Sequence, residues 1–148
     1  MKTVVGNLWD IEADFRGIPT NGYVTKAGDA VMGRGVALQA KERFHGLEGI
    51  LGMAISNYGN KVHFFGPRLF SFPVKHHWRM PASVELIRQS VQELKNVAER
   101  LPTQTFAIPL VGTGNGRLAP EVVWPLLSEL PDNVTVVVLD QNMMVQKS

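Results

Sequence analysis

The chain has 148 residues, of which 45% are hydrophobic, so it is long enough for one compact domain and shows no compositional sign of disorder. Its 15 basic and 13 acidic residues leave a net charge of only +2, which excludes a basic tail or stripe made for coating nucleic acid. It has no cysteine, which excludes disulfides, a thiolate nucleophile and a cysteine-rich zinc site.

The sequence carries no predicted targeting or membrane segment. Acidic side chains occur within residues 1–15, where a signal peptide has an apolar run. No stretch approaches the roughly 20 apolar residues of a membrane span. Together with the absence of cysteine, this favours a cytoplasmic protein without a membrane partner.

Short apolar runs bounded by turn residues predict strands, and stretches with apolar residues three and four apart predict helices. In chain order, the sequence predicts strands at 2–5 and 23–26, helices at 35–44 and 47–58, strands at 62–65 and 69–74, a helix at 83–101, a strand at 106–111, a helix at 121–130 and a strand at 134–139. Ser83 is typical of a helix N-cap, and Pro102 is typical of a residue that follows a helix end.

Strands that alternate with helices of this length require crossover connections. We therefore expect an α/β fold, a three-layer α/β/α sandwich with a mixed, mostly parallel central sheet. Residues 1–148 are expected to form one domain with a core at about 2–140 and a frayed tail at 141–148.

Two glycine-rich loops join predicted strands to predicted helices. The first, 27–35, precedes a helix, and its glycines and the N–H groups of the helix start favour an anion such as pyrophosphate. The second, 112–118, holds three glycines in five residues after a buried strand. Each loop alone can be a tight turn, but two such loops at the carboxyl ends of strands predict a site that clasps one phosphate group.

Lys75 follows an apolar strand directly and precedes His76, His77, Trp78 and Arg79. In an ordinary solvated loop this lysine would have no special role, whereas a closed pocket would lower its pKa and make its amine nucleophilic. The adjacent His76 and His77 point to opposite sides of an extended segment, so we predict no metal site. Trp78 is interpreted as a packing residue or a pocket wall rather than a reader of bases.

Four motifs carry a resemblance to a known family. They are Gly6-Asn7-Leu8, the run VMGRGVALQ at 31–39, the run FPVKHHWR at 72–79 and the run PLVGTG at 109–114. In this order, across about residues 4–139, they resemble the macrodomain family. The resemblance is greatest to the branch that contains the DNA ADP-ribosyl glycohydrolase antitoxin DarG and terminal ADP-ribose protein glycohydrolase.

The resemblance implies a macrodomain fold, ADP-ribose as ligand and product, no required cofactor, and Lys75 as the catalytic residue. Lys75 would attack, or electrostatically support, the anomeric carbon of the distal ribose. The implied ligand-binding residues are Asn7, Leu8, Asn21, Val31, Met32, Gly33, Arg34, Gly35, Val36, Trp78, Gly112, Thr113, Gly114, Asn115, Gly116 and Leu118.

The chain departs from the family pattern at three places. Asn7 lies where many members carry an adenine-binding aspartate, and the segment before the first loop matches the family's ribose-orienting asparagine only through Asn21. The second loop has Asn115-Gly116 where terminal ADP-ribose protein glycohydrolase has an acid. This last departure favours the DNA-directed branch.

The sequence-based hypothesis is therefore an enzyme, an ADP-ribosyl glycohydrolase that releases ADP-ribose from ADP-ribosylated DNA, with protein as the other candidate acceptor. The alternatives are a non-catalytic reader of ADP-ribose and an ADP-ribose 1″-phosphate phosphatase. We expect a monomer, from a bacterium or from a phage that acts in the host cytoplasm. Lys61, Arg68, Arg79 and Arg88 either flank a groove for a DNA strand or are scattered surface charge.

Overall fold

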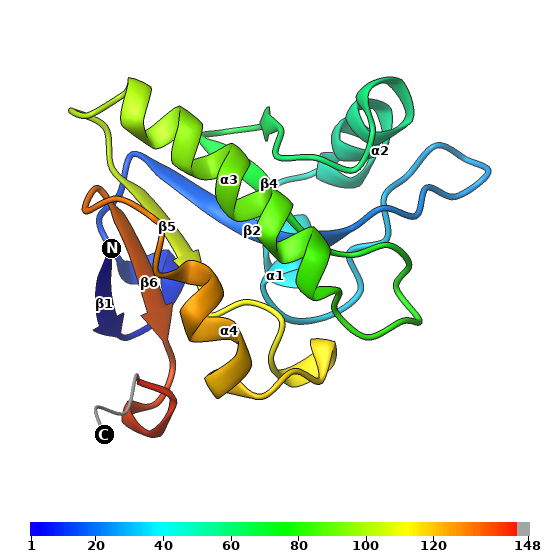
Figure 1. Ribbon diagram of the computed structural model, residues 1–148. Coiled ribbons are helices and arrows are strands. Elements are labelled where there is room, and N and C mark those ends of the chain that lie inside the picture. The colour runs from blue at the N-terminus through cyan, green and yellow to red at the C-terminus, as the bar shows by residue number, and fades with distance from the viewer. Residues whose placement is uncertain (145–148) are drawn as a thin grey trace.

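The computed structural model describes residues 1–144 of the chain, and within them six strands form one sheet (Figure 1). The strands are β1 Lys2–Val5, β2 Phe15–Asn21, β3 Phe64–Phe65, β4 Leu69–Lys75, β5 Phe106–Pro109 and β6 Val134–Val138. Their order is β1-β6-β5-β2-β4-β3, and only the pairing of β3 with β4 is antiparallel. The prediction of a mixed, mostly parallel sheet is confirmed.

Helices cover both faces of the sheet. The α-helices are α1 Gly35–Arg43, α2 Leu47–Tyr58, α3 Val84–Arg100 and α4 Pro120–Leu127, and the short 3-10 helices are η1 Leu8–Asp10, η2 Gly114–Gly116 and η3 Gln141–Met143. One core lies between the sheet and α3 with α4, and a second lies between the sheet and α1 with α2. Figure 1 shows α3 and α4 in front of the sheet and α1 behind it, so the predicted three-layer sandwich is confirmed. None of the helices within residues 1–144 is long and apolar enough to span a bilayer.

Side chains that point alternately to the two faces of the sheet contribute to both hydrophobic cores. On β4, Phe70 and Phe72 face α3, whereas Leu69 joins the core that contains α2. Successive side chains of a strand point to opposite faces, so a strand buried on both sides has an almost continuous apolar sequence. The predicted cap of α3 is also present, because the Ser83 hydroxyl oxygen accepts a hydrogen bond from the Leu86 N–H at 3.2 Å.

The sequence prediction of a strand at 23–26 is wrong, and the strand of this region is β2. Its sequence, FRGIPTN, has no continuous apolar run, and it contains Gly17 and Pro19, which are residue types depleted in strands. Gly17 is small because a Cβ there would lie 2.6 Å from Ile108 Cγ2. Pro19 is tolerated because β2 pairs with β5 only at Phe15 and Arg16, so Pro19 has a partner strand on one side only.

Several predicted boundaries also shift. The predicted strands at 62–65, 106–111 and 134–139 shorten to β3, β5 and β6, and the predicted helix at 121–130 becomes α4. Pro125 lies inside α4, which ends soon afterwards at Leu127. In the segment expected to fray, residues 141–143 form η3, and the Trp124 indole N–H donates to the Met143 carbonyl at 2.9 Å. Residues 145–148 lie outside the described part of the chain.

The sheet has a topological switch point between β2 and β5, and we call the space outside the carboxyl ends of the strands there the crevice. From β2 the chain moves outward to β4 by way of α1 and α2 on one face, and it returns through α3 on the other face to β5. The two strands pair only at Phe15 with Phe106 and at Arg16 with Ala107, after which the pairing stops. Ligands of open α/β sheets bind at such a switch point, outside the carboxyl ends of the strands.

Gly52 of α2 fits directly against the first glycine-rich loop. A Cβ at this position would overlap the Gly28 carbonyl oxygen and lie 2.9 Å from the Ala30 nitrogen. That nitrogen donates to the Glu48 carbonyl at 2.9 Å, so the loop and the helix are held at this distance. The glycine is therefore required by the contact between helix and loop.

We predict that Gly52→Ala lowers the free energy of unfolding by about 1–3 kcal/mol, because the added methyl group overpacks this contact. Glycine to alanine in a helix interior ordinarily stabilises, so a loss identifies the steric cause. Chemical and thermal denaturation followed by circular dichroism measure the change. Gly33→Ala is the matched control, since a Cβ there meets no atom within 4 Å. Equal stability of the two variants would contradict this account.

Candidate functional site

Lys75 lies at the carboxyl end of β4, where the pairing of β4 with β2 brings it opposite Asn21. Its carbonyl oxygen accepts hydrogen bonds from the Gly22 N–H and from the Asn60 side-chain amide, both at 3.1 Å. These two bonds fix the backbone of Lys75. The side chain, which is half-buried, therefore starts from a defined position at the edge of the crevice.

Asn21 connects Lys75 to the first glycine-rich loop. Its side-chain amide donates to the Val31 carbonyl at 2.9 Å, and its side-chain oxygen accepts from the Tyr23 N–H at 3.0 Å. With Asn21 bound in this way, the end of β2 fixes the position of the loop that follows it. The sequence prediction placed Asn21 in the site, and the structure brings it together with Lys75 and Val31.

The first loop has a buried anchor and an exposed end. Met32 is buried in the core that α1 and α2 share, whereas Gly33, Arg34 and Gly35 are exposed. α1 begins at Gly35, and no side chain caps its first turn, so the first amide N–H groups of this helix have no side-chain acceptor. A helix start of this kind, beside the Arg34 guanidinium, favours an anion.

The second glycine-rich loop is held by backbone hydrogen bonds and lies close to the first loop. The Gly116 carbonyl accepts a hydrogen bond from the Ala82 N–H at 2.9 Å, and the Gly112 carbonyl accepts one from the Leu118 N–H at 2.9 Å. A Cβ on Gly35 would lie 4.0 Å from the side-chain nitrogen of Asn115. The two loops therefore approach each other over the crevice. Thr113, Gly114 and Asn115 form the exposed or half-buried side of this loop.

The surroundings of Lys75 disfavour its charged form. Burial lowers the pKa of the Lys75 ammonium below its usual range, and the Arg117 and Arg34 guanidiniums lower that pKa further because they repel a third positive charge. This brings the side chain closer to a neutral, nucleophilic amine. The sequence analysis left open whether a closed pocket lowers this pKa, and it did not identify Arg117 and Arg34 as the neighbouring charges.

Arg117 is a site residue that the sequence analysis missed. It follows the glycines of the second loop directly and adopts a left-handed backbone with φ of 65°, which is rare outside glycine. The signal available in the sequence was its place between two predicted ligand-binding residues, Gly116 and Leu118. Asn60, which holds the carbonyl of Lys75, had no sequence signal because the segment after α2 meets β4 only in the folded chain.

Asn7, Leu8 and Val36 gather at the other end of the crevice. They line a hollow of about 70 Å³ with residues of β5, β6 and α1. Asn7 caps η1, and its side-chain oxygen accepts a hydrogen bond from the Trp9 N–H. This hollow lies at the carboxyl ends of β5 and β6, up to three strand spacings or about 14 Å from β4. A site that includes both ends suits an elongated ligand.

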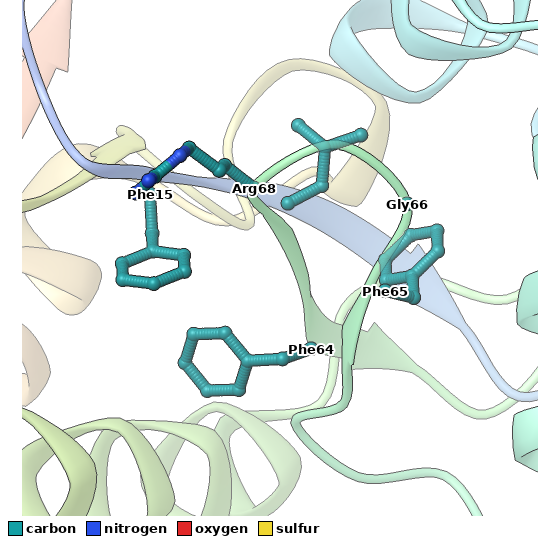
Figure 2. Close-up of a pocket in the computed structure, with 6 residues that line it drawn as sticks. Phe15, Phe64, Phe65, Gly66 and Arg68 are labelled. Carbon is teal, nitrogen blue, oxygen red and sulfur yellow. The ribbon is translucent and has the colours of Figure 1, made fainter.

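A second and larger hollow lies away from Lys75. It has a volume of about 590 Å³ and is lined by Phe15, Phe64, Phe65, Gly66, Arg68 and Leu69. Figure 2 shows the rings of Phe15 and Phe64 beside Arg68. Leu69 begins β4 and Lys75 ends it, so this hollow lies at the opposite end of the strands from the glycine-rich loops. None of the predicted site residues lines it.

Trp78, in the segment after Lys75, lies outside the hydrophobic core. It is 42% exposed and belongs to no core cluster of the described residues, so of its two interpretations only that of a pocket wall stays a prediction. Its ring stacks with His77, with centroids 5.6 Å apart, and the Arg79 guanidinium lies 4.7 Å from its centroid.

Within residues 1–144, no group of three or more histidine or acidic side chains lies close enough to hold a metal ion.

The chain is similar to curated proteins over most of its length, although no family profile matches it. It is 32% identical over 140 residues to the DNA ADP-ribosyl glycohydrolase of Thermus aquaticus, a match that covers 84% of this chain and 35% of that protein. It is 33% identical over 119 residues to the protein of the same name from Mycobacterium tuberculosis, covering 69% of this chain and 33% of that protein. The chain spans about a third of the length of these relatives.

Solved structures agree with this similarity. The macrodomain of Thermus aquaticus DarG has a TM-score of 0.73 at 29% identity, covering 94% of this chain and 97% of that chain. The macrodomain of Mycobacterium tuberculosis DarG has a TM-score of 0.73 at 27% identity, covering 93% and 95%. Thermosipho africanus DarTG in complex with ADP-ribose shares the fold, with a TM-score of 0.76 at 16% identity over 98% of this chain and 43% of that chain. The chain is thus a macrodomain, and it belongs to the branch of that family that the DarG macrodomains represent.

Proposed function

We propose that this chain is an ADP-ribosyl glycohydrolase that hydrolyses the bond between ADP-ribose and DNA. The observation that carries the proposal is Lys75, a half-buried lysine of lowered pKa that lies near two arginines of the glycine-rich loops. A group so perturbed in a crevice is a candidate for catalysis. The names of the Thermus and Mycobacterium relatives support the same activity.

In the proposed complex, ADP-ribose lies along the carboxyl ends of the strands. The adenine end occupies the hollow beside Asn7, Leu8 and Val36. The diphosphate lies between the loops, where the start of α1 and the Arg34 guanidinium supply positive potential. The distal ribose then reaches Lys75, about 14 Å away along the ends of the strands. The structure of Thermosipho africanus DarTG, which shares the fold, is a complex with ADP-ribose.

In the proposed reaction, the neutral Lys75 amine attacks the anomeric carbon of the distal ribose. A bond forms between the lysine nitrogen and this carbon while the bond from the carbon to the base breaks, and the base takes up a proton. Water then attacks the same carbon, which releases ADP-ribose and restores the lysine. The sum is one substrate and one water converted to ADP-ribose and unmodified DNA.

The second loop favours DNA over a protein carboxylate as the acceptor. Residues 109–120 contain no aspartate or glutamate, so no acid of this loop assists the lysine, and the nearby Arg117 is positively charged. A cationic surround attracts a substrate that carries phosphates on both sides of the modified nucleotide.

We predict that Lys75→Ala lowers the rate of ADP-ribose release from ADP-ribosylated single-stranded DNA at least about 100-fold while ADP-ribose still binds. Chromatography of the released ADP-ribose measures turnover, and calorimetry measures binding. Lys75→Arg separates the two roles of the lysine, because it keeps the charge without a nucleophilic amine. Activity in Lys75→Arg would assign an electrostatic role, and an adduct on Lys75 seen by intact mass after an acid quench would assign covalent attack.

Full turnover by Lys75→Ala would contradict the mechanism. Binding without turnover by the wild type, on DNA and on protein substrates, would identify a reader of ADP-ribose. Phosphate release from ADP-ribose 1″-phosphate that persists in Lys75→Ala would identify a phosphatase.

We predict that Arg117→Gln moves the rising limb of the pH profile of kcat/KM, which reports the pKa of the free enzyme, to higher pH. The Arg117 charge lowers the pKa of Lys75, so its removal raises that pKa and decreases the fraction of free amine at neutral pH. The activity lost at neutral pH returns as the pH rises, because well below the pKa the free amine increases about tenfold with each pH unit. Arg100→Gln, at the end of α3, is the control with the same change of charge. An unchanged profile would show that the free amine is not the reacting form.

We predict that Gly33→Ala weakens ADP-ribose binding about tenfold or more without unfolding the domain. A Cβ at Gly33 meets nothing within 4 Å, and its φ is not positive, so the protein itself does not require glycine there. The proposed diphosphate does require it, because the backbone must come close to the phosphate oxygens. Calorimetric titration with ADP-ribose measures the loss, and unchanged affinity would move the diphosphate away from this loop.

A further inference from the structure

An exposed aromatic patch lies next to Lys75 on the same edge of the sheet. It consists of Tyr23, which follows β2, and His77, Trp78 and Arg79, which follow β4, and we call it the aromatic platform. The rings of Tyr23 and His77 lie 4.6 Å apart, and His77 stacks on Trp78. Tyr23 is 39% exposed and Trp78 is 42% exposed. Large aromatic side chains in contact with each other and with water mark a binding surface.

The folded backbone holds the aromatic platform in place. The Arg79 N–H donates to His77 Nδ1 at 3.1 Å, the Met80 N–H donates to the His77 carbonyl at 3.1 Å, and the Tyr23 N–H donates to the Asn21 side chain at 3.0 Å. Neither Tyr23 nor Trp78 belongs to a core cluster of the described residues. The platform is thus positioned by the site, through Asn21 and β4, but does not contribute to the core.

Three chain segments near Lys75 carry only positive charge. Residues 30–41, 75–84 and 109–120, which form the end of the first loop with α1, the segment after Lys75 and the second loop, contain no acid. Their charged residues are Arg34, Lys41, Lys75, Arg79 and Arg117. Of these residues, Arg79 belongs to the aromatic platform, and Arg34 and Arg117 lie near enough to Lys75 to lower its pKa. Phosphates complement such a surface.

We propose that the aromatic platform stacks the unpaired bases that flank the ADP-ribosylated nucleotide, so that this face selects single-stranded DNA. The inference rests on the proposed function and adds a surface to it. A base that enters over the Trp78 ring displaces the Arg79 guanidinium, whose exposed contact with the indole is weaker than a base–aromatic stack. The displaced guanidinium then pairs with a backbone phosphate. Bases inside a duplex are already stacked, so duplex DNA does not use this surface.

The test compares two substrates of one linkage, an ADP-ribosylated thymidine nucleoside and an ADP-ribosylated single-stranded nonamer. We expect Trp78→Ala to lower the ratio of kcat/KM for the nonamer to kcat/KM for the nucleoside at least tenfold. Tyr23→Ala lowers the ratio by a smaller factor, and Trp78→Phe keeps most of it because phenylalanine still stacks. Tyr58→Ala is the matched control, since Tyr58 is 72% exposed at the end of α2 and lies outside the platform.

An unchanged ratio in Trp78→Ala would overturn the inference while leaving the proposed function intact. An equal loss of kcat/KM by Trp78→Ala on an ADP-ribosylated peptide would also overturn it, because the platform would then not select nucleic acid. If the wild type cleaves neither substrate, the proposed function is wrong. The inference about the platform is then tested by DNA binding alone. Fluorescence anisotropy with an unmodified thymidine nonamer is expected to show at least tenfold weaker binding by Trp78→Ala than by wild type or Tyr58→Ala, and equal binding would refute the inference.

Discussion

The parallel pairing of β2 with β4 is the constraint on which the site depends. It brings Asn21 opposite Lys75, with a register shift between Thr20 and Asn21 at the end of the ladder. Asn21 then holds Val31 of the first loop, and the Gly22 N–H holds the carbonyl of Lys75. A slip by one residue would turn the Lys75 side chain to the other face of the sheet, since neighbouring side chains of a strand point in opposite directions. The geometry of the lysine is therefore fixed by the same hydrogen bonds that build the sheet.

The glycines of this chain serve two separate purposes. Gly17 and Gly52 are small because other atoms of the protein fill the space that a side chain would need. Gly33 has open space around it and no positive φ, so the folded protein gives no steric reason for its size. Glycine costs conformational entropy on folding, so a glycine that the fold does not require is typical of a place where a ligand reaches the backbone. Gly33 is therefore a candidate position for the close approach of a ligand, although the sequence pattern is the same for all three glycines.

The sequence alone predicted the layers, the helices and the two loops, because apolar periodicity and caps are local signals. It failed at β2, where packing against Phe70 and Ile108 selects Gly17, and where one-sided pairing permits Pro19. Lys75 was found because a strand end and a resemblance both pointed to it. Arg117 was missed because its nearness to Lys75 comes from the folded second loop, and Asn60 was missed because it acts from the loop after α2. Contacts between residues far apart in the sequence produce no periodic pattern from which they could be predicted.

In the proposed function, Arg34 and Arg117 attract the substrate and lower the pKa of Lys75, and binding of the substrate would oppose the second effect. Arg34 and Arg117 lower the pKa of Lys75, but a bound diphosphate would neutralise much of their effect and raise that pKa again. Burial is the largest cause of the lowered pKa, and a ligand that covers the crevice deepens it by excluding water. In the proposed complex, burial would therefore keep the pKa of Lys75 lowered after the charges of the two arginines are neutralised.

The lowered pKa also reduces the stability of the fold. A lysine whose pKa is lower in the folded state reduces stability below that folded pKa, because the unfolded chain binds the proton more tightly. Stability recovers as the pH rises from the folded pKa toward the unfolded one. Below its folded pKa, Lys75 therefore carries a charge that the fold destabilises, because burial and the Arg117 and Arg34 guanidiniums all disfavour it.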